Sequence, residues 1–264
     1  MKKYFVIGNP IDHSLSPKIH NYWFKKNGIS ATYEKKKLEE NELDLFFSEI
    51  KKKKIDGANV TVPFKRLVIP YLDQLTPEAN ATQSVNTIYI DNNKICGHNT
   101  DIEGFEKSLQ KSNFDLRDKK ILVLGAGGVV PSIVFALKKM KVQKIIITNR
   151  TKSKAESIKR LFKEIQVVNW GFIPEFDMII NATSLGLNNS DKINLNFSEK
   201  IKNKFFYDIV YKPEETNFLK MASKLGNKTE NGKTMFVYQA LAAFKIWHNI
   251  SPEVDKDVYN LLND

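Results

Sequence analysis

The feature that most limits the fold of this chain is an apolar run that ends in a glycine-rich turn. Lys120 to Leu124 is almost wholly apolar, and Gly125-Ala126-Gly127-Gly128 follows at once. Such a run is typical of a strand buried on both faces of a parallel sheet. The pattern from Ile133 to Leu137 then predicts a helix, and Lys144 to Thr148 predicts another buried strand. This order of strand, glycine turn, helix and strand indicates a dinucleotide-binding unit.

The glycine turn has the properties that a pyrophosphate requires. Gly125 permits a tight turn, and Gly127 lets the backbone approach a ligand closely. The following helix offers unpaired N–H groups and the positive end of its dipole. An ordinary glycine-rich turn of an α/β domain is the alternative. Val130 stands where this fingerprint usually has a third glycine or alanine, which calls close packing of helix on strand into question.

The residues after the second of these strands indicate which nicotinamide cofactor binds. Asn149, Arg150, Thr151 and Lys154 come first, and no carboxylate occurs before Glu156. An acidic residue here would accept the ribose 2′-hydroxyl of NAD, whereas a guanidinium can stack on adenine and bind a 2′-phosphate. A basic helix start on the surface is the alternative, but positive charge near a helix N-terminus costs stability. We therefore predict NADP as the cofactor.

The first third of the chain alternates predicted strands and helices. Strands are expected at Tyr4–Ile7, Ala31–Lys35 and Gly57–Val62. Between them, Ser16-Pro17 opens a helix with Ser16 as its cap, and Glu39–Lys53 forms a second helix. This order predicts a parallel sheet with right-handed crossovers. Further along we predict a hairpin of strands 86–90 and 94–97, strands at 177–181 and 205–209, and helices at 235–247 and 254–262.

Composition and charge exclude several classes of protein. The 264 residues are 42% hydrophobic and 27% charged, as in a globular protein of one or two domains. The single cysteine, Cys96, excludes an internal disulfide and favours a reducing compartment. The first apolar stretch ends at Gly8 and is too short for a signal peptide, and no run is long enough to span a membrane. The net charge of +11 comes mostly from dispersed lysines without interleaved aromatic residues. We expect a cytoplasmic protein with no membrane or nucleic-acid partner.

Polar residues gather where the strands of the first third end. The set comprises Ser14, Ser16, the Asn59–Lys65 segment, Asn86 and Asp101. Each has a structural alternative: Ser16 as a helix cap, Lys65 as a surface lysine, Asn86 as a turn residue, and Asp101 as the cap of a helix that starts near Glu103. Their recurrence at strand ends, in a chain that also has a dinucleotide unit, favours a substrate pocket.

These motifs occur together and in order along nearly the whole chain. The segments are Gly8–Pro17, Asn59–Lys65, Val85–Thr87, Asn99–Asp101, Gly125–Gly128, Asn149–Thr151, Asn181–Thr183, Tyr207–Tyr211, Gly232 and Met235–Gln239. The sequence thereby resembles the shikimate dehydrogenase family. The resemblance implies an oxidoreductase that reversibly reduces 3-dehydroshikimate to shikimate with NADPH, on the route to chorismate and the aromatic amino acids.

The resemblance also implies an architecture. We expect two α/β domains: a substrate-binding and catalytic domain of residues 1–101 plus 235–264 with a mostly parallel sheet, and a Rossmann-type NADP-binding domain of residues 102–234. The active site is expected in the cleft between them, and the protein is expected to be a monomer or a homodimer.

Individual roles follow from the same resemblance. The residues matching Ser14, Ser16 and Tyr211 bind the substrate carboxylate, and those matching Thr61, Asn86 and Gln239 bind ring hydroxyls. The cofactor-binding positions are Gly125, Ala126, Gly127, Gly128, Val129, Asn149, Arg150, Thr151, Lys154, Ile209 and Gly232. One departure is Val129-Val130-Pro131-Ser132, where the family commonly has small residues and then a basic one. This loss is expected to weaken phosphate binding unless Arg150 and Lys154 suffice.

Lys65 and Asp101 match the central pair of the family, and their chemistry can be argued independently. Hydride delivery to a ketone leaves negative charge on oxygen, which needs a proton or a cation. The Lys65 ammonium supplies both, or acts mainly as a positioning charge, while Asp101 would hold it and accept a hydrogen bond from a substrate hydroxyl.

No His or Cys spacing predicts a metal site. The competing hypotheses are an NAD-dependent quinate/shikimate dehydrogenase and a catalytically silent protein that binds NADP or a shikimate-like acid.

Overall fold

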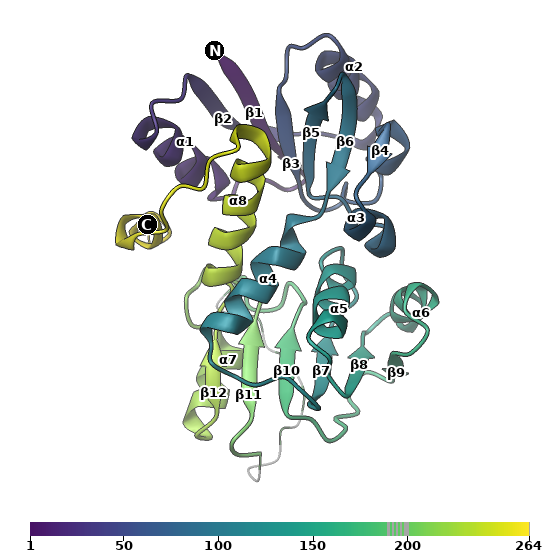
Figure 1. The fold of residues 1–264 in the computed structure, drawn as a ribbon. Helices are drawn as coiled ribbons and strands as arrows, with labels where there is room; N and C mark the ends of the chain where they lie inside the picture. Colours follow the sequence, from purple (N-terminus) through teal and green to yellow (C-terminus); the bar gives the residue numbers. More distant parts are fainter. Residues whose placement is uncertain (189–190, 192, 194, 196, 198–200, 264) are drawn as a thin grey trace. The chain divides into compact units, whose positions relative to one another are not determined.

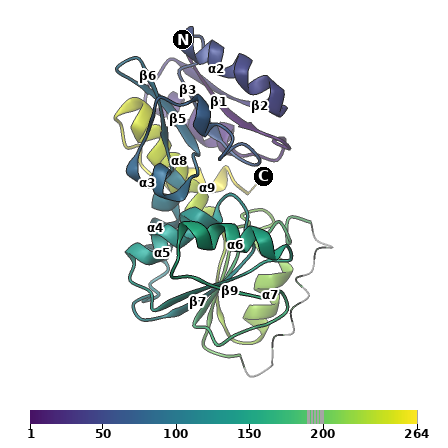
Figure 2. The same cartoon turned by 90° about the vertical axis from the view of Figure 1, so that its right-hand side faces the viewer.

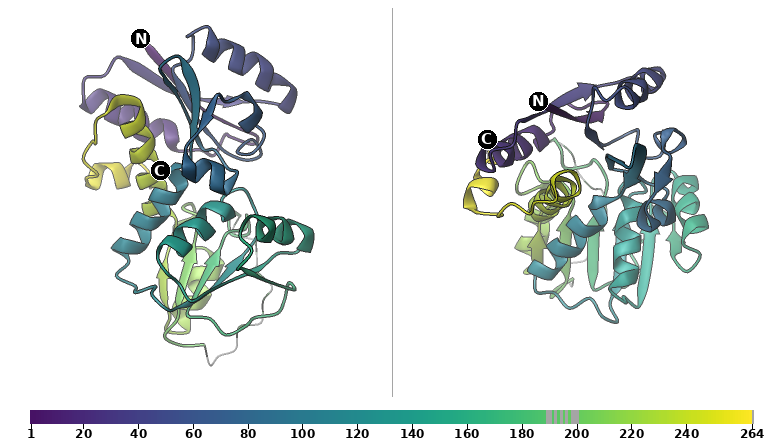
Figure 3. Two further views of the ribbon diagram at one scale, coloured as in Figure 1. Left: turned by 45° about the vertical axis from the view of Figure 1, so that its right-hand side comes forward. Right: turned by 45° about the horizontal axis from the view of Figure 1, so that its top comes forward.

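The chain folds into two units, each built on its own sheet. The computed structural model describes residues 1–188, 191, 193, 195, 197 and 201–263. The first unit comprises Met1–Gly104 and Val237–Asp264, and the second comprises Phe105–Phe236. The C-terminal helix α8 (Lys233–His248) therefore returns to the N-terminal unit, as the yellow helix beside the purple and blue elements in Figure 3 shows. The prediction of two α/β domains is confirmed.

The first unit has a sheet of strand order β2-β1-β3-β5-β6-β4. Its strands are β1 Lys2–Gly8, β2 Ala31–Lys37, β3 Gly57–Val60, β4 Gln74–Leu75, β5 Thr87–Asp91 and β6 Lys94–His98. Strand β1 pairs in parallel with β2 and β3, whereas β5 is antiparallel to β3 and β6. The β5–β6 hairpin turns at Asn92 and Asn93, both at positive φ, as a two-residue turn matched to strand twist requires. The sequence reading missed β4 because two residues carry no periodicity.

Helices cover both faces of this sheet. They are α1 Ser16–Lys26, α2 Leu43–Lys51, α3 Pro77–Thr82, α9 Lys256–Asn260 and the C-terminal part of α8, and the chain leaves the unit within α4 Thr100–Lys111. On one face Tyr4 packs against Phe24 of α1 and Trp247 of α8. On the other, Ile7 shares a core with Phe46 of α2. The alternation along β1 thus places α2 and α8 on opposite faces, as Figure 2 shows.

The predicted cap Ser16 is wrong, and so is the structural alternative that made Asp101 a cap. The N-cap of α1 is Leu15, Ser16 is the first helical residue, and the N-cap side chain makes no capping hydrogen bond. Helix α4 begins at Thr100, so Asp101 lies inside its first turn and does not precede a helix starting near Glu103. Neither side chain caps its helix. Ser16 hydrogen-bonds with Ser14, and Asp101 accepts a hydrogen bond from Asn86.

The second unit is an all-parallel sheet of order β12-β11-β10-β7-β8-β9. Its strands are β7 Lys120–Leu124, β8 Lys144–Thr148, β9 Gln166–Val168, β10 Met178–Asn181, β11 Phe205–Asp208 and β12 Lys228–Glu230. Its helices are α5 Val130–Lys139, α6 Lys152–Leu161 and α7 Asn217–Lys224. Helices α5 and α7 lie on opposite faces of the sheet (Figures 1 and 2). The short elements β9, β12 and α7 were missed by the sequence reading.

Val130 does not loosen the packing of α5. It is fully buried, and so are Ile133, Ala136 and Leu137 on the same helix. The valine therefore fills core volume at the start of α5, contrary to the concern raised by its place in the glycine fingerprint.

Neither a membrane-spanning helix nor a metal-binding cluster occurs among the residues that the structure describes. No helix in these ranges is long and apolar enough to cross a membrane. Within the same ranges, no group of three or more His, Cys, Asp or Glu side chains is arranged to hold a metal ion.

Candidate functional site

The polar segments of the first unit lie together at one edge of its sheet, where the strands β1 and β3 end. Strands β1 and β3 are parallel and end at this edge, and β5 starts there because it is antiparallel to β3, with Asn59 paired to Thr87. The loop that carries Thr61 and Lys65 follows β3, and Asn86 directly precedes β5. Helix α4 begins two residues after β6 ends, which brings Asp101 to the same edge.

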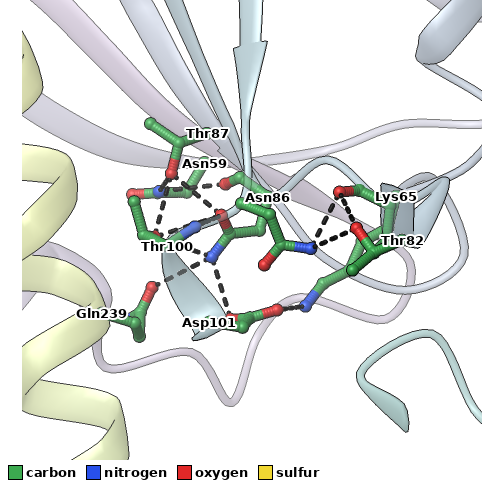
Figure 4. Close-up of polar contacts among 10 residues, drawn as sticks. Asn59, Lys65, Thr82, Asn86, Thr87, Thr100, Asp101 and Gln239 are labelled. Carbon is green, nitrogen blue, oxygen red and sulfur yellow. Dashed lines mark hydrogen bonds and ion pairs between the residues drawn. The ribbon is translucent and has the colours of Figure 1, made fainter. Parts of the chain in front are cut away.

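Lys65 and Asp101 form an ion pair at this edge (Figure 4). The Lys65 Nζ donates a hydrogen bond to Asp101 Oδ2. Their side chains are only 11% and 9% exposed. A charge-assisted hydrogen bond in such a poorly hydrated place is stronger than one on the surface, because less water competes for either partner. Lys65 is therefore not a freely solvated surface lysine.

Asn86 fixes the position of the carboxylate. Its Nδ2 donates to Asp101 Oδ1 and to Thr100 Oγ1, both at 2.9 Å. Its Oδ1 accepts from the Thr100 backbone N–H at 2.7 Å. The residue is 2% exposed, so its amide belongs to a buried network and is not part of a solvated turn. Gln239 of α8 reaches the same amide, with Oε1 3.5 Å from Asn86 Nδ2.

Further buried hydrogen bonds, from Asn59 and Tyr33, hold Asn86 in place. Asn59 Nδ2 donates to the Asn86 carbonyl oxygen at 3.0 Å and to Thr87 Oγ1 at 3.1 Å. The Tyr33 hydroxyl donates to Asn59 Oδ1 at 2.7 Å. Sequence reasoning included Asn59 in a motif but assigned it no role, and it missed Tyr33. The available signal was an asparagine inside the otherwise apolar strand β3, since a buried amide requires partners.

The two serines lie together beside the start of α1. Ser14 Oγ is 3.3 Å from Ser16 Oγ, and the residues are 8% and 6% exposed. Two neighbouring hydroxyls of this kind can present donors to one carboxylate. Thr61 is half-buried, and its hydroxyl makes no hydrogen bond within the described part of the chain.

Tyr211 belongs to the second unit, unlike the other predicted substrate-binding residues. Its ring stacks on that of Phe236, with centroids 4.4 Å apart and an angle of 24° between the planes. The stacking limits the rotation of the phenol about its side-chain bonds.

The glycine turn of the second unit has room for a ligand. Gly125 has φ +107°, and a Cβ there would lie 2.7 Å from the Ala182 carbonyl oxygen, so only glycine fits. Gly127 is exposed, and a Cβ on it would meet nothing closer than 3.9 Å. The N-cap of α5, Val129, places no side chain on the first N–H groups of the helix. Open backbone at a helix N-terminus is suited to a pyrophosphate, so these residues fit a dinucleotide.

The segment after β8 is an exposed cationic turn. Asn149 Nδ2 donates to the Thr151 carbonyl oxygen at 2.8 Å and so holds the turn closed. Arg150 and Lys154 are exposed, and neither makes an ion pair with a described carboxylate. Their charges are therefore available to an anionic group such as a 2′-phosphate, which fits NADP.

Ile209 and Gly232 come together in the second unit. The Gly232 N–H donates to the Val210 carbonyl oxygen at 3.1 Å. A Cβ on Gly232 would lie 2.1 Å from the Ile209 carbonyl oxygen, which is closer than any atom can approach. Gly232 is thus required for the close passage of two backbone segments.

Asp208, at the end of β11, is a buried carboxyl to which the sequence reading gave no role. Burial raises its pKa to about 6, although hydrogen bonds from Thr216, the Val210 N–H and Asn181 act in the opposite direction. Because these donors come from β10, the segment after β11 and the start of α7, the carboxyl joins three elements of the second unit.

Comparisons with known proteins agree with this arrangement. The family model described as the shikimate dehydrogenase substrate binding domain matches residues 6–88. The model described as shikimate / quinate 5-dehydrogenase matches residues 108–213. The first match covers the segments that carry Ser14, Lys65 and Asn86, and the second covers the glycine turn and the cationic turn.

Individual relatives match over nearly the full length. Shikimate dehydrogenase (NADP(+)) of Pelagibacter ubique is 58% identical over 264 residues, which is 100% of both chains. The crystal structure of shikimate dehydrogenase from Aquifex aeolicus has a TM-score of 0.91 at 38% identity, covering 100% of this chain and 98% of that one. The enzyme from Thermus thermophilus in complex with NADP(H) and shikimate has a TM-score of 0.87 at 30% identity, covering 99% and 97%. The chain therefore belongs to the shikimate dehydrogenase family.

Proposed function

We propose that this protein reversibly reduces 3-dehydroshikimate to shikimate with NADPH as the hydride donor. The observation that carries the proposal is the largely buried Lys65–Asp101 ion pair, held by Asn86 at a sheet edge of the first unit. Lys65 and Asn86 lie within the segment that matches a substrate-binding domain, and Asp101 follows that segment. An ion pair inside a polar network is suited to a substrate whose carbonyl oxygen becomes an alkoxide.

The chemistry assigned to the pair follows from the charge that develops. NADPH, held by the glycine turn and the cationic turn, would supply the hydride that the carbonyl carbon receives. The Lys65 ammonium would either donate a proton to the carbonyl oxygen, which gives the alcohol, or stabilise the alkoxide by its charge until solvent water protonates it. Asp101 keeps the ammonium in place and accepts from a neighbouring substrate hydroxyl. Asn86 orients Asp101, because its amide already binds the second carboxylate oxygen.

The remaining residues bind and orient the two ligands. Ser14 and Ser16 donate to the substrate carboxylate, with the Tyr211 phenol as a further donor, and Thr61, Asn86 and Gln239 bind ring hydroxyls. The cofactor is held by the Gly125–Val129 turn and by backbone near Ile209 and Gly232, with its 2′-phosphate on Asn149, Arg150, Thr151 and Lys154. The exposed cations and the open helix N-terminus support this assignment.

Steady-state oxidation of shikimate and of quinate, each with NADP and with NAD, tests the proposal. We expect a markedly higher kcat/KM with shikimate and NADP, measured as absorbance of the reduced nicotinamide. Comparable values for NAD and NADP would remove the cofactor assignment, and a preference for quinate would favour the quinate/shikimate alternative. Binding of NADP without turnover of either acid would identify a silent binding protein.

We infer a cytoplasmic enzyme that acts as a monomer or homodimer on small molecules, without nucleic acid or membrane. The dispersed lysines and the single buried Cys96 support this setting. Light scattering of the purified protein gives its mass in solution, and a mass above that of a dimer would contradict the inference.

A further inference from the structure

A cavity lies in the first unit, at the sheet edge opposite the ion pair. It has a volume of about 260 Å³ and is formed by the first half of β1, the segment before β3, the second half of β5 and the end of α8. None of its lining residues belongs to the proposed substrate or cofactor sites.

Aromatic rings form one wall of the cavity. Tyr4, Gly57 and Tyr89 are aligned across three strands, so Tyr4 and Tyr89 face the same side of the sheet. Between them Gly57 leaves space for Trp247, since a Cβ there would lie 2.7 Å from Trp247 Nε1. The indole donates to the Ile88 carbonyl oxygen at 3.0 Å, and its ring centroid is 4.7 Å from that of Tyr4. The wall is therefore held in place by the glycine, the hydrogen bond and the ring contact.

Two polar groups with free hydrogen-bonding capacity line another part of the cavity. Asp56 Oδ2 accepts from the Lys3 backbone N–H at 2.8 Å, but Oδ1 has no hydrogen-bond partner among the residues that the structure describes. The Tyr4 hydroxyl also makes no hydrogen bond within the described ranges, although the residue is only 2% exposed. Burial and the Asp56 charge both raise the pKa of this phenol, which keeps it protonated as a hydrogen-bond donor.

Two lysines supply positive charge at the mouth. Lys2 and Lys53 are exposed and line the cavity, and no described carboxylate pairs with either. The cavity thus offers an aromatic wall, one carboxylate and two ammonium groups. A simple aromatic acid would leave Asp56 unpaired, and an aromatic amine would leave both lysines unpaired.

We propose that this cavity is a binding site for an aromatic α-amino acid. The ring lies against Trp247 and Tyr89, the ammonium group binds Asp56, and the carboxylate binds Lys2 and Lys53. The volume suits a ligand of this size and is below the range of about 300–1,000 Å³ that is usual for larger ligands. Trp247 lies eight positions beyond Gln239 on α8, about 12 Å at 1.5 Å per residue, so the ligand occupies a site separate from the substrate.

Calorimetric titration of the full-length protein tests the proposal. L-Phenylalanine is the probe, compared with 3-phenylpropionate, which lacks the amine, and phenethylamine, which lacks the carboxylate. We expect saturable one-to-one binding of L-phenylalanine and binding at least tenfold weaker for the two analogues. Saturating shikimate should leave the L-phenylalanine affinity unchanged. Absence of saturable binding, equal binding of all three compounds, or competition by shikimate would overturn the proposal.

Variants of the polar groups make the test specific to this cavity. Asp56→Asn keeps an acceptor for the Lys3 N–H and removes the charge, and Lys2→Gln with Lys53→Asn removes both cations. Each is expected to weaken L-phenylalanine binding at least tenfold. Lys51→Gln with Lys52→Gln makes the same charge change outside the lining and should not alter it. Equal affinities of the wild type and Asp56→Asn would contradict the site. Because shikimate oxidation by these variants should be unchanged, failure here leaves the proposed reaction untouched.

Discussion

At the scale of single residues, the ion pair depends on what surrounds it. The Asp101 carboxylate has a partner on each oxygen, Lys65 on one and Asn86 on the other. Two buried or nearly buried charges are tolerated only when such hydrogen bonds replace the lost water. The pair is thus preorganised before a substrate arrives, which is the condition for electrostatic stabilisation of a developing alkoxide.

Replacing Lys65 tests its role directly. We expect Lys65→Ala to lower kcat by about 10²–10⁴, the range for loss of a positioned acid–base group. Steady-state kinetics with shikimate and NADP measure this, and circular dichroism checks that the variant is folded. A rise in KM with almost unchanged kcat would show that Lys65 only binds substrate.

Arg150 carries the prediction on cofactor choice. Arg150→Ala is expected to raise KM for NADPH roughly 10- to 100-fold at little cost in kcat, because hydrogen bonds to a charged group contribute about 1.5–3 kcal/mol. The preference for NADP over NAD should fall in parallel. Arg117→Ala, at another exposed arginine, is the matched control. An unchanged NADP preference in Arg150→Ala would place the phosphate elsewhere.

At the scale of secondary-structure elements, the close approach of two backbone segments determines which parts of the second unit are in contact. The end of β11 passes the residue that precedes α8 so closely that only Gly232 fits. This contact brings Ile209 and Gly232, which are far apart in the sequence, to one place in the second unit. Short elements such as α7 and β12 complete the same region, although their sequences are too brief to show periodicity.

Substitution of Gly232 tests this passage. Gly232→Ala is expected to destabilise the protein by about 3 kcal/mol or more, since its Cβ overlaps the Ile209 carbonyl group. Gly226→Ala is the control: Gly226 has φ +77° but no atom within 4 Å of a Cβ, so it carries only the left-handed backbone penalty of about 1–2 kcal/mol. Denaturant unfolding measures both. Equal losses of stability would mean that the backbone passage adjusts easily.

At the scale of the whole molecule, an aromatic core holds the first unit together across the length of the chain. His20 of α1 stacks on Tyr33, with ring centroids 4.3 Å apart, and also packs near Phe244 and Trp247 of α8. Both of its ring nitrogens are buried without hydrogen bonds among the described residues. Burial, with a smaller contribution from His248, lowers its pKa from 6.5 to about 3.

This histidine should make stability depend on pH. Because the folded-state pKa is lowered, the unfolded chain takes up a proton below about pH 6.5 while the folded chain does not until about pH 3. His20 therefore favours unfolding increasingly as the pH falls through this window, by about 1.4 kcal/mol per pH unit. We expect His20→Phe to flatten the decline of unfolding free energy between about pH 7 and pH 5. The exposed His13, changed to Gln, is the control, and an unaltered slope in His20→Phe would refute the assignment.

The sequence by itself determined the two α/β domains, the glycine turn, the cationic segment after β8 and the polar strand ends. These features are local: strand and helix periods, glycine spacing and charge can be read within about twenty residues. The tertiary structure decided which polar residues meet. It made Asn86 the centre of a network supported by Asn59 and Tyr33, and it brought Gln239 from α8. Hydrogen bonds between distant segments leave no periodic trace, because they depend on sheet order and on the path of the backbone.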